Sequence, residues 1–252
     1  MHGIFKQPQR HQLFASGVVS HCTAGTNSAV GISGGDGCMI SDCVASFNLS
    51  HGIEAGVGAS LTHCAATNNT GEGISANVAC TISECSAVTN GGNGISTGEN
   101  NAIHNCTARS NGFSGLVAGI GSALTESTSA ANAGKRIEMG DGTEVRHCAV
   151  RANGLTGILV PSDCYVLENN CTGNNTANEG SSGGIIINGL NSRVDSNHCN
   201  ANFRVGMYGG GSPFVIRNTA RGNHPTNFSV ILEWSGQGTG VDSSYPWLNF
   251  TS

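Results

Sequence analysis

Charge is scarce in this sequence, and little of it is basic. Asp, Glu, Lys and Arg make up 11% of the 252 residues, the formal net charge is −5, and the longest basic run is the pair Lys135-Arg136. Because nucleic-acid-binding proteins present a clustered basic face, we expect no nucleic-acid partner. The sequence also lacks a run of 18 apolar residues, so we expect no membrane-spanning helix.

A signal segment is missing as well. The first residues, Met1 to Lys6, contain no apolar stretch of the kind that directs secretion, so these residues give no evidence about location. A chain with so little charge and 38 glycines would normally suggest disorder. The regular repetition of the sequence overrules that interpretation, because the small residues recur at fixed positions.

A 21-residue unit is written seven times without a gap from Cys22 to Glu168, and three further units follow. A fixed period of roughly 20 to 50 residues is typical of stacked supersecondary units. Only one interval deviates: the units at Asn169 and Asn197 start 28 residues apart, so seven residues are inserted there. The units begin at Cys22, Cys43, Cys64, Cys85, Cys106, Ser127, Cys148, Asn169, Asn197 and Asn218.

Equivalent positions of the units hold the same type of residue. Ten residues after each start stands a large apolar residue, from Ile32 in the first unit to Phe228 in the last; in the unit with the insertion we assign this position to Ile186. Five residues after each start stands an asparagine without exception: Asn27, Asn48, Asn69, Asn90, Asn111, Asn132, Asn153, Asn174, Asn202 and Asn223.

Parallel coils explain this pattern. If each unit is one turn of a solenoid, equivalent residues stack about 4.7–4.9 Å apart on neighbouring parallel strands, and asparagines at a bend hydrogen-bond along the stack. A leucine-rich repeat would show more leucine positions. Stacked helices would need an apolar period of 3.6 residues, and left-handed hexapeptide coils favour multiples of six. The sequence therefore predicts an all-β, single-stranded parallel β-helix of about ten coils.

The chain resembles right-handed parallel β-helix repeat proteins of the pectate-lyase-like superfamily, and more narrowly secreted bacterial β-helix proteins of unknown activity. The narrower likeness rests on the glycine-isoleucine and asparagine positions of the coils and on the tail Pro246-Trp247-Leu248-Asn249-Phe250. The resemblance implies a secreted or cell-surface protein with a structural or carbohydrate-binding role. The alternative it implies is a polysaccharide lyase, glycoside hydrolase or epimerase. We expect a monomer, with polysaccharide as the partner.

One domain with two covered ends is expected, because a solenoid grows by length and its terminal coils expose strand edges. We predict an N-terminal lead-in over residues 1–18, the β-helix over 19–234 and a capping tail over 235–252. Tryptophan occurs only at Trp234 and Trp247. These aromatic residues could bind sugar rings, although capping suits their terminal position better.

The 11 cysteines are an odd number. Six of them start a unit and fall in one inward column, where they could be buried thiols that act as small apolar side chains. Neighbours one strand apart are also close enough for a disulfide. The sequence leaves both alternatives open.

The sixth unit departs most from the consensus, and the acidic and basic side chains gathered there are the catalytic candidates. We expect Asp141 and Asp163 to lie close together on adjacent coils. Carboxylates here could hold Ca²⁺ or act as acid and base, and a cation could bind a uronate carboxylate or abstract a proton. The alternative is a surface cluster of ion pairs. The candidates are Lys135, Arg136, Glu138, Asp141 and Asp163.

The residue before each unit alternates between acid and histidine, as in Asp42, His63 and Glu84. Such a column could ligate a transition metal, or it could simply avoid stacking like charges.

Glycine precedes the apolar position in most units, as at Gly31 and Gly52. It could leave a shallow trough for a polymer or serve the bend. Loops on rigid scaffolds often recognise ligands, so Arg204 and Tyr208, one coil beyond the insertion, are substrate-binding candidates.

Known enzyme patterns of the superfamily are otherwise missing. The Gly-His-Gly and Arg-Ile-Lys motifs of polygalacturonase-like hydrolases do not occur, and paired carboxylates for glycoside hydrolysis are not evident. The sequence thus predicts the fold clearly and leaves catalysis undecided.

Overall fold

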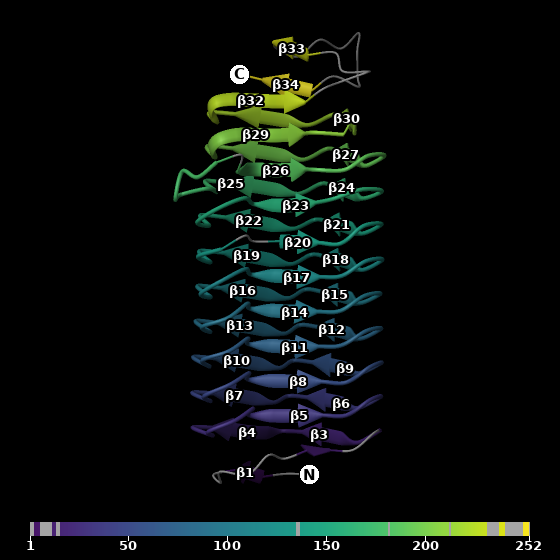
Figure 1. Cartoon of the computed structure of the whole chain (residues 1–252), viewed down its shortest axis with the longest axis vertical. Helices are drawn as coiled ribbons and strands as arrows, with labels where there is room; N and C mark the ends of the chain where they lie inside the picture. Colours follow the sequence, from purple (N-terminus) through teal and green to yellow (C-terminus); the bar gives the residue numbers. More distant parts are fainter. Residues whose placement is uncertain are drawn as a thin grey trace.

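A computed structural model of the chain describes residues 3–5, 12–13, 16–134, 137–180, 182–211, 213–230, 237–239 and 249–251. It is a column of stacked coils in which three parallel sheets run the length of the molecule (Figure 1). The expectation of an all-β parallel solenoid with ten coils is therefore confirmed. No helix in the described part of the chain has the length and apolarity to cross a membrane.

Each coil contributes one short strand to each sheet. Sheet A consists of β1 (Gly3–Phe5), β4 (Cys22–Gly25), β7 (Val44–Ser46), β10 (Ala65–Thr67), β13 (Ser86–Val88), β16 (Thr107–Arg109), β19 (Thr128–Ala130), β22 (Ala149–Arg151), β25 (Asn170–Thr172), β28 (His198–Asn200), β31 (Thr219–Arg221), β34 (Asn249–Thr251) and β33 (Gln237–Thr239). Sheet B consists of β2 (Gln12–Leu13), β5 (Ile32–Gly34), β8 (Ile53–Ala55), β11 (Ile74–Ala76), β14 (Ile95–Thr97), β17 (Leu116–Ala118), β20 (Ile137–Met139), β23 (Ile158–Val160), β26 (Gly183–Ile187), β29 (Phe203–Gly209) and β32 (His224–Val230). Sheet C consists of β3 (Val18–Ser20), β6 (Met39–Ser41), β9 (Ser60–Thr62), β12 (Thr81–Ser83), β15 (Ala102–His104), β18 (Ala123–Thr125), β21 (Glu144–Arg146), β24 (Tyr165–Leu167), β27 (Arg193–Asp195) and β30 (Phe214–Ile216).

The 21-residue period is the distance between neighbours in the fold. Ile53 pairs with Ile74, and Leu61 pairs with Ile82, each across parallel strands. All four side chains are fully buried, so the two apolar columns of the sequence form the core. Fully apolar stacking of this kind suits strands that are covered on their inner face.

The asparagine column forms a hydrogen-bonded ladder at the bend between sheets A and B. Asn48 lies between its two predicted neighbours: it accepts from Asn27 Nδ2 at 2.7 Å and donates through its own Nδ2 to Asn69 Oδ1 at 2.8 Å. The same link continues through every coil to Asn223. The ladder satisfies buried amide groups that would otherwise be unpaired.

Every coil turns three corners, and a residue with positive φ stands at each of them. In one coil these residues are His63 (φ 52°), Asn68 (φ 54°) and Ala79 (φ 58°). The left-handed backbone region is unfavourable for most side chains, so the corners are stabilised by their surroundings, above all by the polar residue that follows each of them in the chain.

The glycine column does not form a surface trough, and that alternative is wrong. Gly52 is buried, and a methyl group on it would lie 2.5 Å from Asn69 Nδ2 and 2.7 Å from the Gly73 carbonyl oxygen. Glycine is needed because the asparagine ladder and the next coil occupy the space of a side chain.

The strand after the insertion is shifted by one residue from the predicted alignment. Ile158 pairs with Ile185, not with Ile186, which instead pairs with Leu159 on the outer side. Ile185 is 27 residues after Ile158, whereas Val194 is 28 residues after Val166. Six of the seven inserted residues therefore precede the strand and one follows it.

All 11 cysteines are buried and unpaired, which agrees with the free-thiol alternative. Burial raises the pKa of the Cys148 thiol to about 12. Beyond Cys148 the unit-start column changes from cysteine to Asn169, Asn197 and Asn218, which form a second amide ladder with Nδ2 to Oδ1 distances of 2.9 and 3.0 Å.

The two ends contribute strands beyond the predicted β-helix. Strands β1 and β2 of the predicted lead-in pair with sheets A and B, and β33 and β34 of the predicted tail pair with sheet A. Trp234 and Trp247 lie outside the described residues, so their capping role stays a prediction.

Candidate functional site

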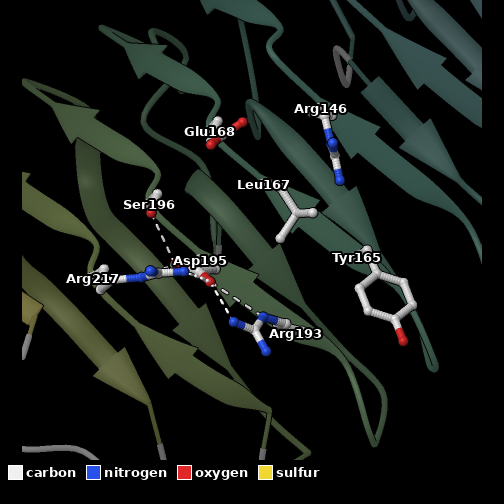
Figure 2. Close-up of a pocket in the computed structure, with 8 residues that line it drawn as sticks. All are labelled: Arg146, Tyr165, Leu167, Glu168, Arg193, Asp195, Ser196 and Arg217. Carbon is white, nitrogen blue, oxygen red and sulfur yellow. Dashed lines mark hydrogen bonds and ion pairs between the residues drawn. The ribbon is translucent and has the colours of Figure 1, made fainter. Parts of the chain in front are cut away.

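A cavity of about 360 Å³ opens on the outer face of sheet C near its C-terminal end. Strands β21, β24 and β27 and the bends that follow sheet C build it, and Figure 2 shows its side chains. The central residues of these strands, such as Val166 and Val194, point inward and are fully buried. Their neighbours therefore point outward. The cavity is lined by Arg146, Tyr165, Leu167, Glu168, Arg193, Asp195, Ser196 and Arg217.

Asp195 is the centre of the polar network in this cavity. Its residue is only 4% exposed. One carboxylate oxygen accepts from Arg193 Nε at 3.2 Å and Arg193 Nη2 at 2.6 Å, and the other accepts from Arg217 Nε at 2.8 Å and Ser196 Oγ at 2.9 Å. Arg217 Nη2 also donates to this carboxylate. One acid is thus held between two guanidinium groups.

These contacts fix the charge of the group. Burial by itself would raise the pKa of Asp195, but the hydrogen bonds from Arg217, Arg193 and Ser196 outweigh it and lower the pKa to about 2. The same carboxylate raises the pKa of Arg217. Asp195 is therefore ionised at any physiological pH, and it acts as a structural anion that orients two cations.

The two arginines are further positioned by their neighbours. The Arg193 guanidinium lies over the Phe214 ring, 5.6 Å from its centre, which is within the range of a cation–π contact. Both side chains are about two-fifths exposed, so donors that do not bond Asp195 remain accessible to a ligand.

Arg146 and Tyr165 form the opposite side of the cavity, with Leu167 between them and the Asp195 cluster (Figure 2). Arg146 Nε lies 2.8 Å from Glu144 Oε1, and Tyr165 is 54% exposed. The cavity thus presents a phenol ring and an apolar floor between cationic groups.

The chemistry of this arrangement is that of anion binding. Three arginines face two carboxylates, and Glu168 is already paired with His147 Nε2 at the rim. Asp195, with a pKa of about 2, cannot serve as a general acid near neutral pH. Planar guanidinium groups match carboxylates in bidentate geometry.

A second, smaller cavity of about 200 Å³ contains the two predicted substrate-binding residues. Arg204 and Tyr208 both come from β29 of sheet B and face the insertion. The sequence prediction thus brings together residues that do share a concave surface. The lining residues are Gly180, Ser182, Arg204, Val205, Tyr208, Pro225, Thr226 and Ser229.

The catalytic candidates of the sixth unit do not converge on a shared partner. Asp141 Oδ1 accepts from the Ser162 backbone N–H at 2.9 Å, whereas Asp163 Oδ1 accepts from Asn191 Nδ2 at 3.2 Å. Each carboxylate therefore bonds the coil that follows it. Glu138 lies between Val117 and Leu159 on sheet B.

The cations of that unit, Lys135 and Arg136, lie outside the described residues. A catalytic role for the sixth unit stays a prediction.

The acid–histidine column forms ion pairs along the molecular axis. His63 Nδ1 is 3.8 Å from Asp42 Oδ1, and His63 Nε2 is 2.8 Å from Glu84 Oε2. Its two ring nitrogens therefore face opposite neighbours. Among the residues that the structure describes, no group of three His, Cys, Asp or Glu side chains has the arrangement to hold a metal ion. This geometry favours the charge-alternation alternative, and the same finding covers the predicted Ca²⁺ ligands Glu138, Asp141 and Asp163.

The sheet C cavity was missed by sequence reasoning, although a signal exists. The outward positions of sheet C are small in the early coils, as at Ser41, Thr62 and Ser83, and become Arg146 and Asp195 in the later ones. Comparison of outward columns, instead of whole units, would have found this change.

Comparison of the sequence with protein-family models gives no match, and comparison with curated proteins gives none either. Solved structures do match. The A-module of the mannuronan C-5 epimerase AlgE4 from Azotobacter vinelandii has a TM-score of 0.57 at 15% identity, covering 89% of this chain and 64% of that chain.

Two phage proteins are similar to the same extent. The Dettilon tailspike protein gp208 has a TM-score of 0.60 at 14% identity, over 87% of this chain and 54% of that one. The tailspike gp49 of Acinetobacter baumannii bacteriophage Fri1, a capsular polysaccharide depolymerase, has a TM-score of 0.56 at 8% identity, over 89% and 50%. The chain thus spans between half and two thirds of these structures. These likenesses establish the fold: the protein is a right-handed parallel β-helix of the pectate-lyase-like type.

Proposed function

We propose that this protein binds an acidic polysaccharide at the sheet C cavity. The observation that supports it is the cluster in which Arg193 and Arg217 share the single buried carboxylate of Asp195, with Arg146 across the cavity. One anion cannot neutralise two guanidinium groups, so the cavity keeps a positive charge although the chain has a net charge of −5. A carboxylate on a sugar ring would complete the pairing.

The rest of the lining suits a sugar. Tyr165 offers an exposed ring on which the apolar face of a pyranose can stack, and Leu167 provides an apolar floor. Ser196 adds a hydroxyl group at the edge. A concave surface with an aromatic wall and a few convergent polar groups is typical of small-ligand sites.

The similar structures support the same ligand class. One is an epimerase that acts on mannuronan, which is an acidic polysaccharide, and another is a capsular polysaccharide depolymerase. Since polysaccharides of this kind occur outside the cell, we propose a secreted or cell-surface location. We also propose that the protein acts as a monomer, because the cavity is complete within one chain.

Titration with oligosaccharides tests the proposal. We expect hexamers of mannuronate or galacturonate to bind, and the carboxyl-reduced hexamers to bind at least tenfold more weakly. The double variant Arg193→Gln, Arg217→Gln should lose at least tenfold in affinity. Arg109→Gln, Arg151→Gln is the matched control, because these exposed arginines lie on sheet A outside the cavity, and it should change affinity less than twofold. Equal losses in the two double variants would contradict a specific site.

Catalysis is the alternative, and the same samples decide it. Lyase or hydrolase activity would produce unsaturated products or new reducing ends, and epimerase activity would change the uronate composition without cleavage. We expect none of these above the level of a Tyr165→Phe, Arg146→Gln variant. Turnover that this variant abolishes would show that the cavity is an active site.

A further inference from the structure

The cavity on sheet B is built around an unusual backbone conformation. Arg204 lies within strand β29 and has a φ of 80°. Side chains other than glycine rarely adopt this region, and such outliers concentrate where a ligand is held. Arg204 is exposed, and its Nε and Nη2 both lie 3.4 Å from the Asn178 carbonyl oxygen. These long contacts leave most of the donor capacity of the guanidinium available.

The inserted loop that faces Arg204 is held by a buried amide. Asn175 is fully buried, and its Nδ2 donates to the carbonyl oxygens of Phe203, Ser182 and Glu179 at 3.1, 3.3 and 3.4 Å. Its Oδ1 accepts from the Glu179 backbone N–H at 3.0 Å. The loop is therefore fixed to strand β29 and forms a preorganised wall.

The lining of this cavity is that of a polyol site with one positive charge. Hydroxyl groups come from Ser182, Thr226, Ser229 and Tyr208, and Arg204 is the one charged residue among the eight described lining residues. The volume of about 200 Å³ is below the roughly 300–1,000 Å³ of pockets for drug-sized ligands. This size suits one sugar ring, not a polymer segment.

We propose that the sheet B cavity is a second binding site, which takes a single acidic sugar residue, with its carboxylate on Arg204 and its ring on Tyr208. The two cavities lie on different sheets of the same coils, so the protein would hold two glycan strands at once and link them. The ligand class rests on the proposed function, whereas the existence and place of the site rest on this cavity alone.

Calorimetric titration of the full chain with trimers of mannuronate, guluronate and galacturonate tests the proposal, with mannotriose as the neutral control. We expect two equivalents of at least one uronate trimer to bind the wild-type protein. Arg204→Gln should leave one equivalent, and so should Arg193→Gln, Arg217→Gln. All three substitutions together should abolish binding.

The outcomes separate the two proposals. One equivalent that is lost in Arg193→Gln, Arg217→Gln and kept in Arg204→Gln would overturn the second site and leave the first. One equivalent with the reverse pattern would support the second site and overturn the first. Absence of binding by every trimer, or equal binding of mannotriose, would overturn the second site.

A glycine variant shows whether the effect of Arg204 is a folding effect. Arg204→Gly removes the side chain and relieves the backbone at φ 80°, so we expect an unchanged or higher melting temperature together with loss of one equivalent. A lower melting temperature with both equivalents retained would overturn the proposal. Cross-linking is tested separately: wild-type protein should raise the light scattering of a mannuronan solution, and Arg204→Gln should not.

Discussion

The first coils and the last coils of this molecule have the same interior and different exteriors. Between residues 11 and 108 the sequence contains no Lys or Arg and six acidic residues, whereas all nine remaining Lys and Arg follow from Arg109 onward. On sheet C, Ser83 occupies the outward position that Arg146 occupies three coils later. Inside, Ile82 and Val166 are both fully buried.

This difference shows that scaffold and site are separable in a solenoid. A coil contacts mainly its two neighbours, so inward positions must match along the axis, and outward positions need only tolerate solvent. The later coils could thus acquire arginines, aromatics and an insertion without a change in the core. Four predictions sharpen or break this comparison.

The largest effect is expected from the asparagine ladder. Asn111 Nδ2 donates to Ala87 O and to Asn132 Oδ1, both at 3.0 Å, and its Oδ1 accepts from the Asn90 backbone N–H at 3.0 Å. Asn111→Ala would leave several buried groups unpaired, and we expect it to lower the free energy of unfolding by about 3–5 kcal/mol. Denaturant titration followed by circular dichroism measures this.

Controls for the ladder come from both regions. Asn202→Ala, in the later coils, should cost as much as Asn111→Ala, because its rung is equivalent. Asn77→Ala, at an exposed bend, should cost less than about 1 kcal/mol. A much smaller cost at Asn202 would show that the two halves do not share one scaffold.

The next effect is expected from the buried glycines. Gly52→Ala places a methyl group 2.7 Å from the Gly73 carbonyl oxygen, and Gly157→Ala places one 2.4 Å from the Gly184 carbonyl oxygen. Backbone atoms cannot move away easily, so each should cost about 2–3 kcal/mol. Thermal unfolding measures both, and a neutral Gly52→Ala would revive the surface-trough alternative.

A smaller effect, confined to the later coils, is expected from acid. The pKa of Asp195 is lowered to about 2 in the folded protein, against about 3.9 in an unfolded chain. The ionised acid therefore stabilises the fold above pH 4, and this contribution is lost as the pH falls from about 4 to 2. Because the two arginines are partly exposed and screened, we expect about 1–2 kcal/mol.

The difference in unfolding free energy between wild type and Asp195→Asn isolates this term. It should be largest at pH 5–7 and vanish near pH 2. A difference that persists at pH 2 would show that the substitution acts through packing and not through charge.

The smallest effect is expected from an arginine placed on the early coils. Ser83→Arg reproduces the outward residue of Arg146 on the uniform part of sheet C, and we expect a change below about 0.5 kcal/mol in stability. It should create no uronate binding, because no equivalent of Asp195 orients the new side chain. Cooperative destabilisation would contradict the independence of interior and exterior.

The sequence predicted the fold because inward residues are constrained twice, by the core and by the coils on either side. Ile53 and Asn48 recur for that reason. The one error of alignment, Ile186 in place of Ile185, arose because an insertion can be divided between the two ends of a strand without changing the period of the next coil.

The site was harder to predict because its residues are not constrained in this way. Arg193, Asp195 and Arg217 are outward or corner residues of neighbouring coils, and nothing in a single unit marks them as partners. Arg204 and Tyr208 were found because an insertion in a strict repeat is visible in the sequence. Unusual composition alone, as in the sixth unit, did not indicate convergence.

The side-chain amides at the corner between sheets A and B all point the same way: each Nδ2 donates toward the C-terminal neighbour, from Asn27 to Asn223. Aligned amides polarise one another, so the row behaves as one electrical filament and not as separate bonds. Loss of a single member would cut that filament in two, and a rod stretched from its ends should tear first at the cut.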